Sequence, residues 1–143
     1  MAHFSFLAAR TQKVFMKAVV FSSGVFIFLI ATSFTTGNGL DDIIRALQKG
    51  SASEISKYFD DTIQLTLPDK SDSYSRAQAT IILQDFFNNN GVKSFDVKHK
   101  GDNGGSEFCI GTLTTRSGSY RTTVFMTNKN GKQLLKEIRF QSM

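Results

Sequence analysis

The dipeptide Asn130-Gly131 is the feature that most constrains the fold of this chain. Both central residues of a type I′ turn need positive φ, and asparagine followed by glycine satisfies that need. The segments on either side, Tyr120–Thr127 and Gln133–Gln141, have the length and composition of β-strands. The dipeptide therefore predicts a β-hairpin, and with it an antiparallel sheet near the C-terminus.

Two further turn sequences extend this hairpin into a meander. Ser117-Gly118 precedes it, and Asn103-Gly104-Gly105 follows a strand predicted over Val92–Lys100. The strand between those two turns is apolar on both faces, so the face that meets the core stays open. Gly111 lies inside this strand, where glycine is typical of a bulge or a sharp bend. We expect a curved four-stranded meander.

The residues before the meander predict three helices and one strand. The sequences Ser51-Ala-Ser-Glu54 and Ser75-Arg-Ala-Gln78 each have the spacing of a capping box at a helix N-terminus. Thr62–Leu67 alternates as a strand does, and Asp69–Ser73 is expected to be a polar loop. Apolar residues at helical spacing mark the first helix, which ends at Lys49-Gly50: Leu40, Ile43, Ile44 and Leu47. The same spacing marks the longest helix, over 75–90: Ala79, Ile82, Leu83, Phe86 and Phe87.

The predicted order is helix, helix, strand, helix and then four strands. This order indicates an α+β fold: a curved antiparallel sheet with a four-stranded C-terminal meander, covered on one face by three helices. Residues 37–143 are expected to form this single domain.

Residues 1–36 have the form of an export sequence rather than of a folded segment. The uncharged run Ala18–Phe34 follows Lys13 and Lys17, and small residues suited to cleavage come after it. Two alternatives stay open: a cleaved signal peptide, or an uncleaved signal anchor over residues 18–34, near the lower length limit of a spanning helix. Both alternatives predict that the domain lies on the far side of the cytoplasmic membrane. After cleavage it would be periplasmic or secreted. Translation could start at Met1 or at Met16.

The charge distribution argues against a nucleic-acid partner. The chain has a net charge of +5, but from Gly37 onward 14 basic residues face 12 acidic ones without forming a run. The membrane is expected to be contacted only through the N-terminal segment. Cys109 is the single cysteine, which excludes an internal disulfide and a cysteine-based metal cluster. We expect it to be a buried apolar side chain, and we predict no metal and no cofactor.

Few residues are candidates for chemistry. His99 is the one histidine of the body and a weak candidate for a catalytic base. Tyr120 and Arg121, beside Thr112 on the neighbouring strand, are candidates for binding a ligand, with arginine suited to an anionic group. The strand acids Asp96 and Glu107 are expected to face solvent.

Several segments resemble known proteins: Gly50-Ser-Ala-Ser-Glu-Ile-Ser-Lys-Tyr-Phe59, Tyr74-Ser-Arg-Ala-Gln-Ala79 with Phe86-Phe87, His99-Lys100-Gly101, Ile110-Gly-Thr-Leu-Thr114 and Gly118-Ser-Tyr-Arg121. Over about residues 39–141 the chain resembles a family of exported bacterial proteins with a domain of unknown function. That family lies in the cone-shaped α+β superfamily of nuclear transport factor two, ketosteroid isomerase and cystatin-like folds. The resemblance implies a fold, a single domain and an exported product, and it assigns no active site.

These observations favour an exported, non-catalytic module that binds a small ligand or an envelope protein and could pair through its sheet as a homodimer. One alternative is an isomerase- or dehydratase-like enzyme with a pocket between helix 75–90 and the sheet, near Thr112, Tyr120 and His99. The other is a membrane-anchored domain of an envelope assembly.

Overall fold

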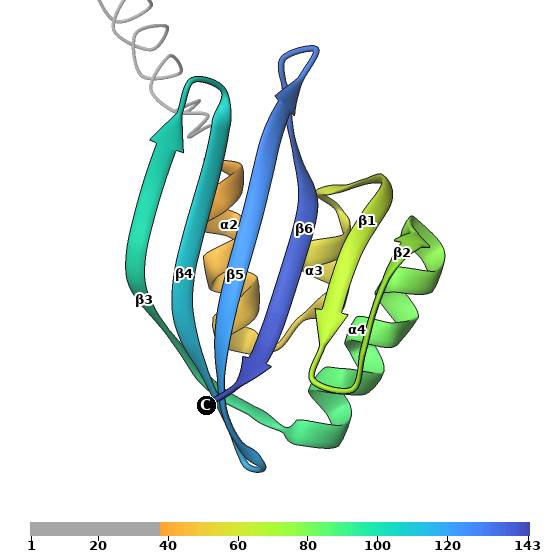
Figure 1. Cartoon of the computed structure of the whole chain (residues 1–143), viewed down its shortest axis with the longest axis vertical. Coiled ribbons are helices and arrows are strands. Elements are labelled where there is room, and N and C mark those ends of the chain that lie inside the picture. The colour runs from red at the N-terminus through yellow and green to blue at the C-terminus, as the bar shows by residue number, and fades with distance from the viewer. Residues whose placement is uncertain (1–37) are drawn as a thin grey trace, which may run out of the picture. The chain divides into compact units, whose positions relative to one another are not determined.

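The computed structural model describes residues 38–143; the predicted leader and the two translation starts lie outside these residues. The helices and strands follow in this order (Figure 1): α2 (Gly39–Lys49), α3 (Ala52–Ser56), β1 (Phe59–Leu67), β2 (Lys70–Ser75), α4 (Arg76–Asn90), β3 (Val92–Asn103), β4 (Ser106–Thr115), β5 (Gly118–Lys129) and β6 (Lys132–Ser142). Within this part of the chain, no helix is both long enough and apolar enough to cross a membrane.

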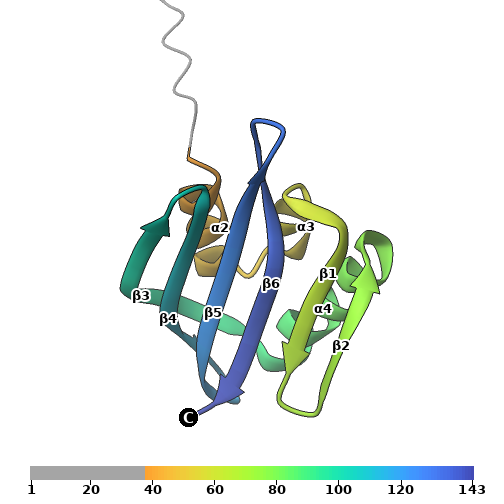
Figure 2. The ribbon, with the colours of Figure 1, turned by 45° about the horizontal axis from the view of Figure 1, so that its top comes forward.

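The strands form one curved sheet in the order β2-β1-β6-β5-β4-β3. The four C-terminal strands make the predicted antiparallel meander. The strand β1 pairs with β6 in parallel, and β2 pairs with β1 antiparallel at the edge. The three helices lie on one face of the sheet, as Figure 2 shows. The predicted α+β architecture is confirmed. The strand expected over Thr62–Leu67 is β1, whose parallel pairing with β6 differs from the expected antiparallel sheet, and β2 is an additional strand.

The Asn130-Gly131 turn has the geometry that the sequence predicts. Asn130 and Gly131 connect the paired residues Lys129 and Lys132, with φ values of 55° and 80°. Positive φ at both positions is what a type I′ turn requires. The other two hairpins of the meander also turn over two residues, between Asn103 and Ser106 and between Thr115 and Gly118.

Bulges in β3 and β6 change which residues face the helices. In β3 the register shifts at Lys98, opposite Gly111 of β4. A Cβ atom on Gly111 would lie 2.6 Å from the backbone oxygen of Asp96, so the two strands approach too closely there for a side chain. In β6 the register shifts at Lys136, because Phe125 pairs with Glu137 and Met126 with Leu135. The bulge predicted at Gly111 therefore exists, with the extra residue on the partner strand.

The segment predicted as a polar loop, Asp69–Ser73, is instead mostly strand β2. Its residues pair with β1 from Lys70 opposite Leu67 to Ser75 opposite Thr62. All of its side chains are exposed or half-buried, so no alternation of apolar and polar residues marked it as a strand. The strand β1 also begins at Phe59, three residues before the predicted start.

The core lies between the sheet and the helices. The helix α4 begins with the predicted capping box, in which Ser75 and Gln78 each accept a hydrogen bond from the other's backbone N–H. Gly50 and Gly91 end α2 and α4 with left-handed backbone conformations. In β4 the core face is the one with Cys109, Leu113 and Thr115, which resolves the open orientation of this strand. The larger buried side chains include Phe59, Phe140, Ile43, Leu47, Ile55, Ile63, Leu83 and Met126.

Candidate functional site

Aromatic rings fill the space between α4 and the sheet. The Phe86 ring lies 4.8 Å from that of Phe140 and 5.3 Å from that of Tyr120, centroid to centroid. The Phe87 ring lies 6.0 Å from both Phe86 and Phe140. Phe86, Phe87 and Phe140 are buried. The space between this part of α4 and the sheet is therefore filled by aromatic rings.

A cleft of about 300 Å³ opens beside these rings. It forms where the turn between β1 and β2, the C-terminal half of α4 and the start of β5 meet at one end of the sheet (Figure 1). We call it the α4 cleft. Its apolar lining is contributed by Leu67, Pro68, Ile82, Phe86 and the ring of Tyr120, and its polar lining by Asp69, Lys70, Asp85, Asn89 and Asn90.

Hydrogen bonds hold the aromatic wall of the α4 cleft in place. The Tyr120 hydroxyl donates to Asn90 Oδ1 at 2.8 Å, and Asn90 Nδ2 donates to the backbone oxygen of Phe86 at 2.8 Å. The Asn90 backbone oxygen in turn accepts from the backbone N–H of Arg116. Tyr120 is thus fixed at both its ring and its hydroxyl, which leaves the ring edge as a rigid surface.

The charged groups of the cleft lie at its rim. Asp69, Lys70 and Asp85 are exposed, and among residues 38–143 none of the three forms an ion pair. Two carboxylates and one ammonium group are therefore free to meet polar groups of a ligand. No histidine and no cysteine lines this cleft.

The structure separates the three predicted ligand-binding residues. Tyr120 pairs with Leu113 and faces the helices, whereas Arg121 pairs with Thr112 on the opposite face of the sheet. Successive residues of a strand point to opposite faces, so Tyr120 and Arg121 cannot line one pocket. Only Tyr120 lies at the α4 cleft, and the expected grouping of the three is wrong. A role for Thr112 and Arg121 on the outer face stays a prediction.

His99 also lies outside the cleft. It is exposed and pairs with Ile110, and its ring lies 5.5 Å from that of Phe108. The bulge at Lys98 has shifted the strand so that Lys100, not His99, points toward α2, where it forms an ion pair with Asp41 at 2.8 Å. The expectation that His99 lies near the space under α4 is therefore wrong.

The two strand acids and the cysteine differ in their exposure. Asp96 is exposed, as predicted, and forms an ion pair with Lys98. Glu107 is half-buried and accepts a hydrogen bond from Gln133, so the expectation of a solvent-facing carboxylate is wrong. Cys109 is buried, as predicted, and burial raises the pKa of its thiol to about 11. Within residues 38–143, no group of three His, Cys, Asp or Glu side chains could hold a metal ion.

Most of the α4 cleft could not be identified from the sequence. Its lining comes from three segments far apart in the chain, and most of the residues there are common types for turns and helix ends. The one usable indication was Tyr120, an aromatic residue directly after a turn.

Comparisons with known proteins agree with this architecture. A DUF4783 family protein from Bacteroides uniformis is 31% identical, and the match covers 74% of this chain and 98% of that one with a TM-score of 0.71. For a DUF4783 family protein from Bacteroides ovatus the identity is 34%, the coverage 71% and 93%, and the TM-score 0.69. A search of curated proteins finds no match.

A more distant structure shows the wider fold. An NTF2-like protein of unknown function from Cytophaga hutchinsonii is 11% identical, with 80% of this chain and 95% of that one covered and a TM-score of 0.56. At this identity the likeness shows the fold alone, and it confirms the predicted nuclear transport factor two-like architecture. A family model described as a domain of unknown function (DUF4783) matches residues 40–141. The chain therefore belongs to the DUF4783 family.

Proposed function

We propose that this protein is a non-catalytic module that binds a small, partly apolar ligand in the α4 cleft. The observation that carries this proposal is a cleft of about 300 Å³ with an apolar wall, at whose rim Asp69, Lys70 and Asp85 form no ion pair within residues 38–143. Binding pockets of this kind combine apolar lining with a few polar groups that orient the ligand. The lower end of the usual pocket volume, about 300 Å³, suits a small molecule rather than a peptide.

Two neighbouring isoleucines of α4 allow a matched test. Ile82 lines the cleft, whereas Ile81 is 64% exposed and points elsewhere. The variant Ile82→Trp should fill the cleft and abolish binding, and Ile81→Trp should leave it intact. The measurement is a thermal-shift screen of small compounds, followed by NMR titration of each compound that stabilises the protein. Compounds that bind both variants equally well, or a screen without a single binder, would contradict the proposal.

We propose further that the module acts outside the cytoplasm. The support is the cationic and apolar composition of residues 1–36, which suits a signal peptide or a signal anchor. Cell fractionation should find the protein in the envelope or the medium, and its intact mass separates a cleaved leader from an anchor over residues 18–34. Recovery from the cytoplasm at full length would contradict this localisation.

A second copy of the chain is the partner that we propose for the outer face of the sheet. There Phe108 and Phe125 form a cross-strand pair next to Ile110, and Phe125 is 37% exposed. Analytical ultracentrifugation should show a homodimer that Phe125→Asp converts to a monomer. The control is Ile81→Asp, which removes an exposed apolar residue from α4 and should leave the dimer unchanged. A wild-type protein that sediments as a monomer would refute this pairing.

A further inference from the structure

A second groove lies at the other end of the sheet from the α4 cleft. It has a volume of about 420 Å³ and lies between the first turn of α2, the end of α3 and the hairpin of β5 and β6. Its lining consists of Gly39, Lys57, Tyr58, Gly131, Lys132, Gln133 and Leu134. We call it the lysine groove, because its two charged residues are both lysines.

The two lysines are not neutralised by the protein. Lys57 and Lys132 are exposed, and within residues 38–143 neither forms an ion pair. Other lysines nearby differ in this respect: Lys129 and Lys136 both approach the buried carboxylate of Asp60, at 3.8 Å and 2.8 Å. The lysine groove therefore carries two positive charges without a carboxylate partner in this part of the chain, whereas the charges of Lys129 and Lys136 are compensated by Asp60.

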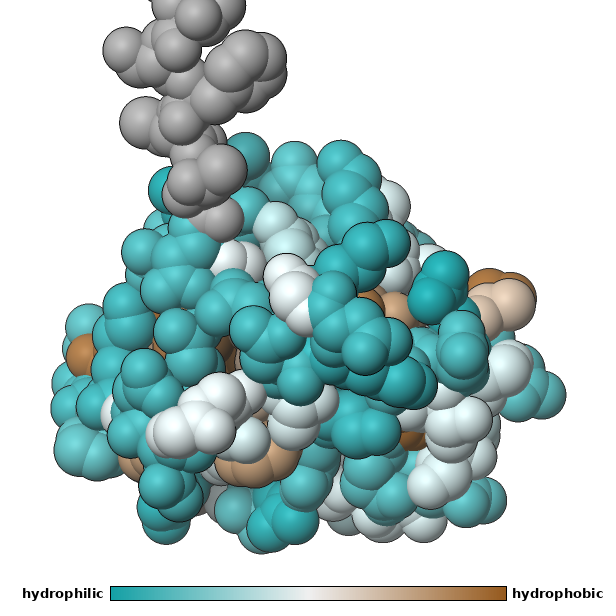
Figure 3. All heavy atoms as spheres, turned by 90° about the horizontal axis from the view of Figure 1, so that it is seen from above, coloured by the Kyte–Doolittle hydropathy of each residue, from teal (hydrophilic) through white to brown (hydrophobic). Residues whose placement is uncertain are grey.

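The acids near the groove already have partners. Glu54, one turn before Lys57, pairs with Lys49 at 3.8 Å. The Tyr58 hydroxyl donates to Asp42, which also pairs with Arg45, and these bonds lower the pKa of Asp42 and raise that of Tyr58 to about 12. Glu107 accepts from Gln133 Nε2 at 2.9 Å. Figure 3 views this end of the molecule, whose surface is predominantly hydrophilic.

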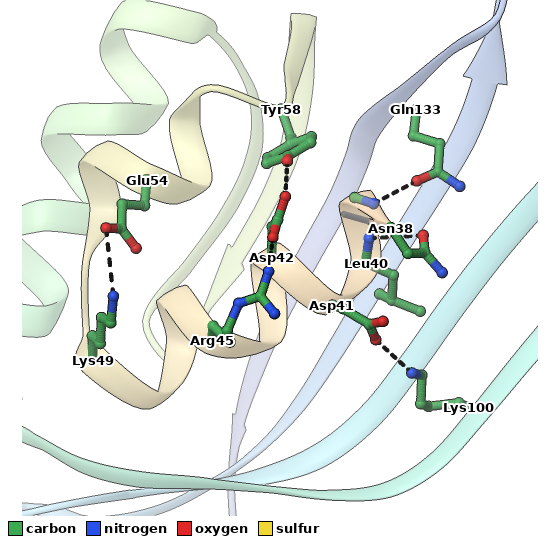
Figure 4. Close-up of polar contacts among 11 residues, drawn as sticks. Asn38, Leu40, Asp41, Asp42, Arg45, Lys49, Glu54, Tyr58, Lys100 and Gln133 are labelled. Atoms are coloured by element: carbon green, nitrogen blue, oxygen red, sulfur yellow. Dashed lines mark hydrogen bonds and ion pairs between the residues drawn. The ribbon is translucent and has the colours of Figure 1, made fainter. Parts of the chain in front are cut away.

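The walls of the groove are rigid. Gln133 Oε1 accepts from the backbone N–H of Gly39 at 2.8 Å, which joins β6 to the first turn of α2. Figure 4 shows Gln133 directed at this turn and Tyr58 directed at Asp42 of the same helix. Because the Gly39 amide is used in this way, the positive character of the groove comes from the lysine side chains rather than from the helix terminus.

We infer that the lysine groove binds a phosphate group. Ammonium groups bind phosphate as point charges, and this groove carries two of them, one at the end of α3 and one at the start of β6. The groove lies beside Asn38, where the domain continues into the segment that we propose enters or crosses the membrane. Two sources of phosphate fit this chemistry, namely the headgroup of an anionic phospholipid and a free phosphate ester. The inference does not depend on ligand binding in the α4 cleft.

The test uses residues 38–143, so that the leader does not itself bind lipid. The Bacteroides uniformis structure indicates that such a domain folds by itself, since 98% of that chain is covered by this domain. Co-sedimentation with phosphatidylcholine vesicles, with and without phosphatidylglycerol, tests the headgroup. NMR titration with glycerol 3-phosphate tests the free ester.

The double variant Lys57→Gln/Lys132→Gln should lose binding in whichever arm the wild type binds. For vesicles we expect about a thirty-fold loss, about 2 kcal/mol, because each lysine near an anionic surface contributes about 1 kcal/mol. The control Lys93→Gln/Lys98→Gln removes the same charge from β3 and should keep most of the binding. Binding of anionic vesicles alone identifies the headgroup, and binding of the ester alone identifies a soluble ligand. Failure of both arms, or equal losses in the two double variants, would overturn the inference.

Discussion

Among residues 38–143, Asp60 is the one Asp, Glu, Lys, Arg or His that is buried. It lies at the start of β1, where the extra residue of the β6 bulge, Lys136, reaches it at 2.8 Å. The Asp61 backbone N–H also donates to its carboxylate. The hydrogen bond from Lys136, assisted by this amide and by Lys129, holds the pKa of Asp60 below its usual value. The bulge therefore serves to place a cation opposite a carboxylate that has little access to water.

The variant Asp60→Asn should lower the free energy of unfolding by about 1–3 kcal/mol at neutral pH, since it removes charged hydrogen-bond partners. A carboxylate with a depressed pKa stabilises the folded state fully above its unfolded pKa, about 3.9, and loses this contribution as the pH falls through its folded pKa. The gap between wild type and variant should therefore narrow below about pH 4. Urea denaturation of both proteins, at neutral pH and below about pH 4, measures this difference in the free energy of unfolding.

The neighbouring residue supplies the control for this experiment. The Asp61 side chain is 91% exposed and pairs with Arg76 at 3.5 Å. Exposed pairs contribute little, so Asp61→Asn should change the stability by less than about 0.5 kcal/mol. Equal losses from the two variants would show that burial of Asp60 is unimportant.

Gly111 is a second residue whose role follows from its immediate surroundings. A methyl group there would meet the Asp96 backbone oxygen and the Phe95 ring, both at 2.6 Å. Neither neighbour can retreat without moving β3 or the core. Gly111→Ala should therefore destabilise the fold by about 1–3 kcal/mol, measured as a lower urea midpoint. The control is Ser119→Ala, on the adjacent strand β5, which should leave the urea midpoint nearly unchanged. If Gly111→Ala also left the midpoint unchanged, the close approach of β3 and β4 at Gly111 would be contradicted.

At the scale of elements, α4 depends on its capping box. Its first turn has no acidic residue and its last turn no basic residue, so side-chain charges do not complement the helix dipole at either end. The hydrogen bonds between Ser75 and Gln78 are therefore the main polar stabilisation of its N-terminus. Because this helix also forms one wall of the α4 cleft, its start determines where Ile82 and Phe86 lie.

Removal of the Ser75 hydroxyl should lower the free energy of unfolding by about 1 kcal/mol, the usual value for an N-cap serine. Equilibrium denaturation of Ser75→Ala provides the measurement. The control is Ser94→Ala, at an exposed position of β3, which should leave the free energy of unfolding nearly unchanged. A loss no larger than that of Ser94→Ala would mean that packing alone positions α4.

The elements that could be predicted from the sequence are those with local chemistry. The Asn130-Gly131 turn, the capping box of Ser75 and Gln78 and the apolar stripe of α4 each need only a few adjacent residues. Of the capping box predicted at Ser51 only one half forms: Ser51 accepts from the Glu54 backbone N–H, whereas the Glu54 carboxylate pairs with Lys49. The strand β2 gave no such pattern because almost all of it is exposed. The shifts of phase at Lys98 and Lys136 depend on a partner strand, so the face on which His99 lies could not be derived from alternation.

At the scale of the whole molecule, stability should be uneven across the sheet. The strand β5 lies between β4 and β6 and carries the buried residues Thr122, Val124 and Met126. The strand β2 is at the edge, with β1 as its single neighbour in the sheet and no buried side chain. Regions with few buried contacts open locally at low cost in free energy.

Hydrogen exchange should therefore be fastest in β2 and slowest in the centre of β5. Mass spectrometry of exchanged and digested protein resolves both segments. Because β2 adjoins the turn that lines the α4 cleft, a ligand bound there should slow exchange in 67–70 more than in β5. If β2 and β5 were equally protected from hydrogen exchange in the protein without ligand, the sheet would open only as a unit.

The parallel pairing of β1 with β6 also constrains the order of folding. Leu65, near the middle of the chain, finds its partner Ile138 only when the C-terminal strand is present. During synthesis, the sheet that joins the two halves cannot be completed until residues 132–142 have left the ribosome. Contacts so distant in sequence form slowly, because a long loop must close first. Until then the edges of β1 and β5 that β6 pairs with stay unpaired, and unpaired strand edges are the part of a sheet that is most prone to pair with other chains.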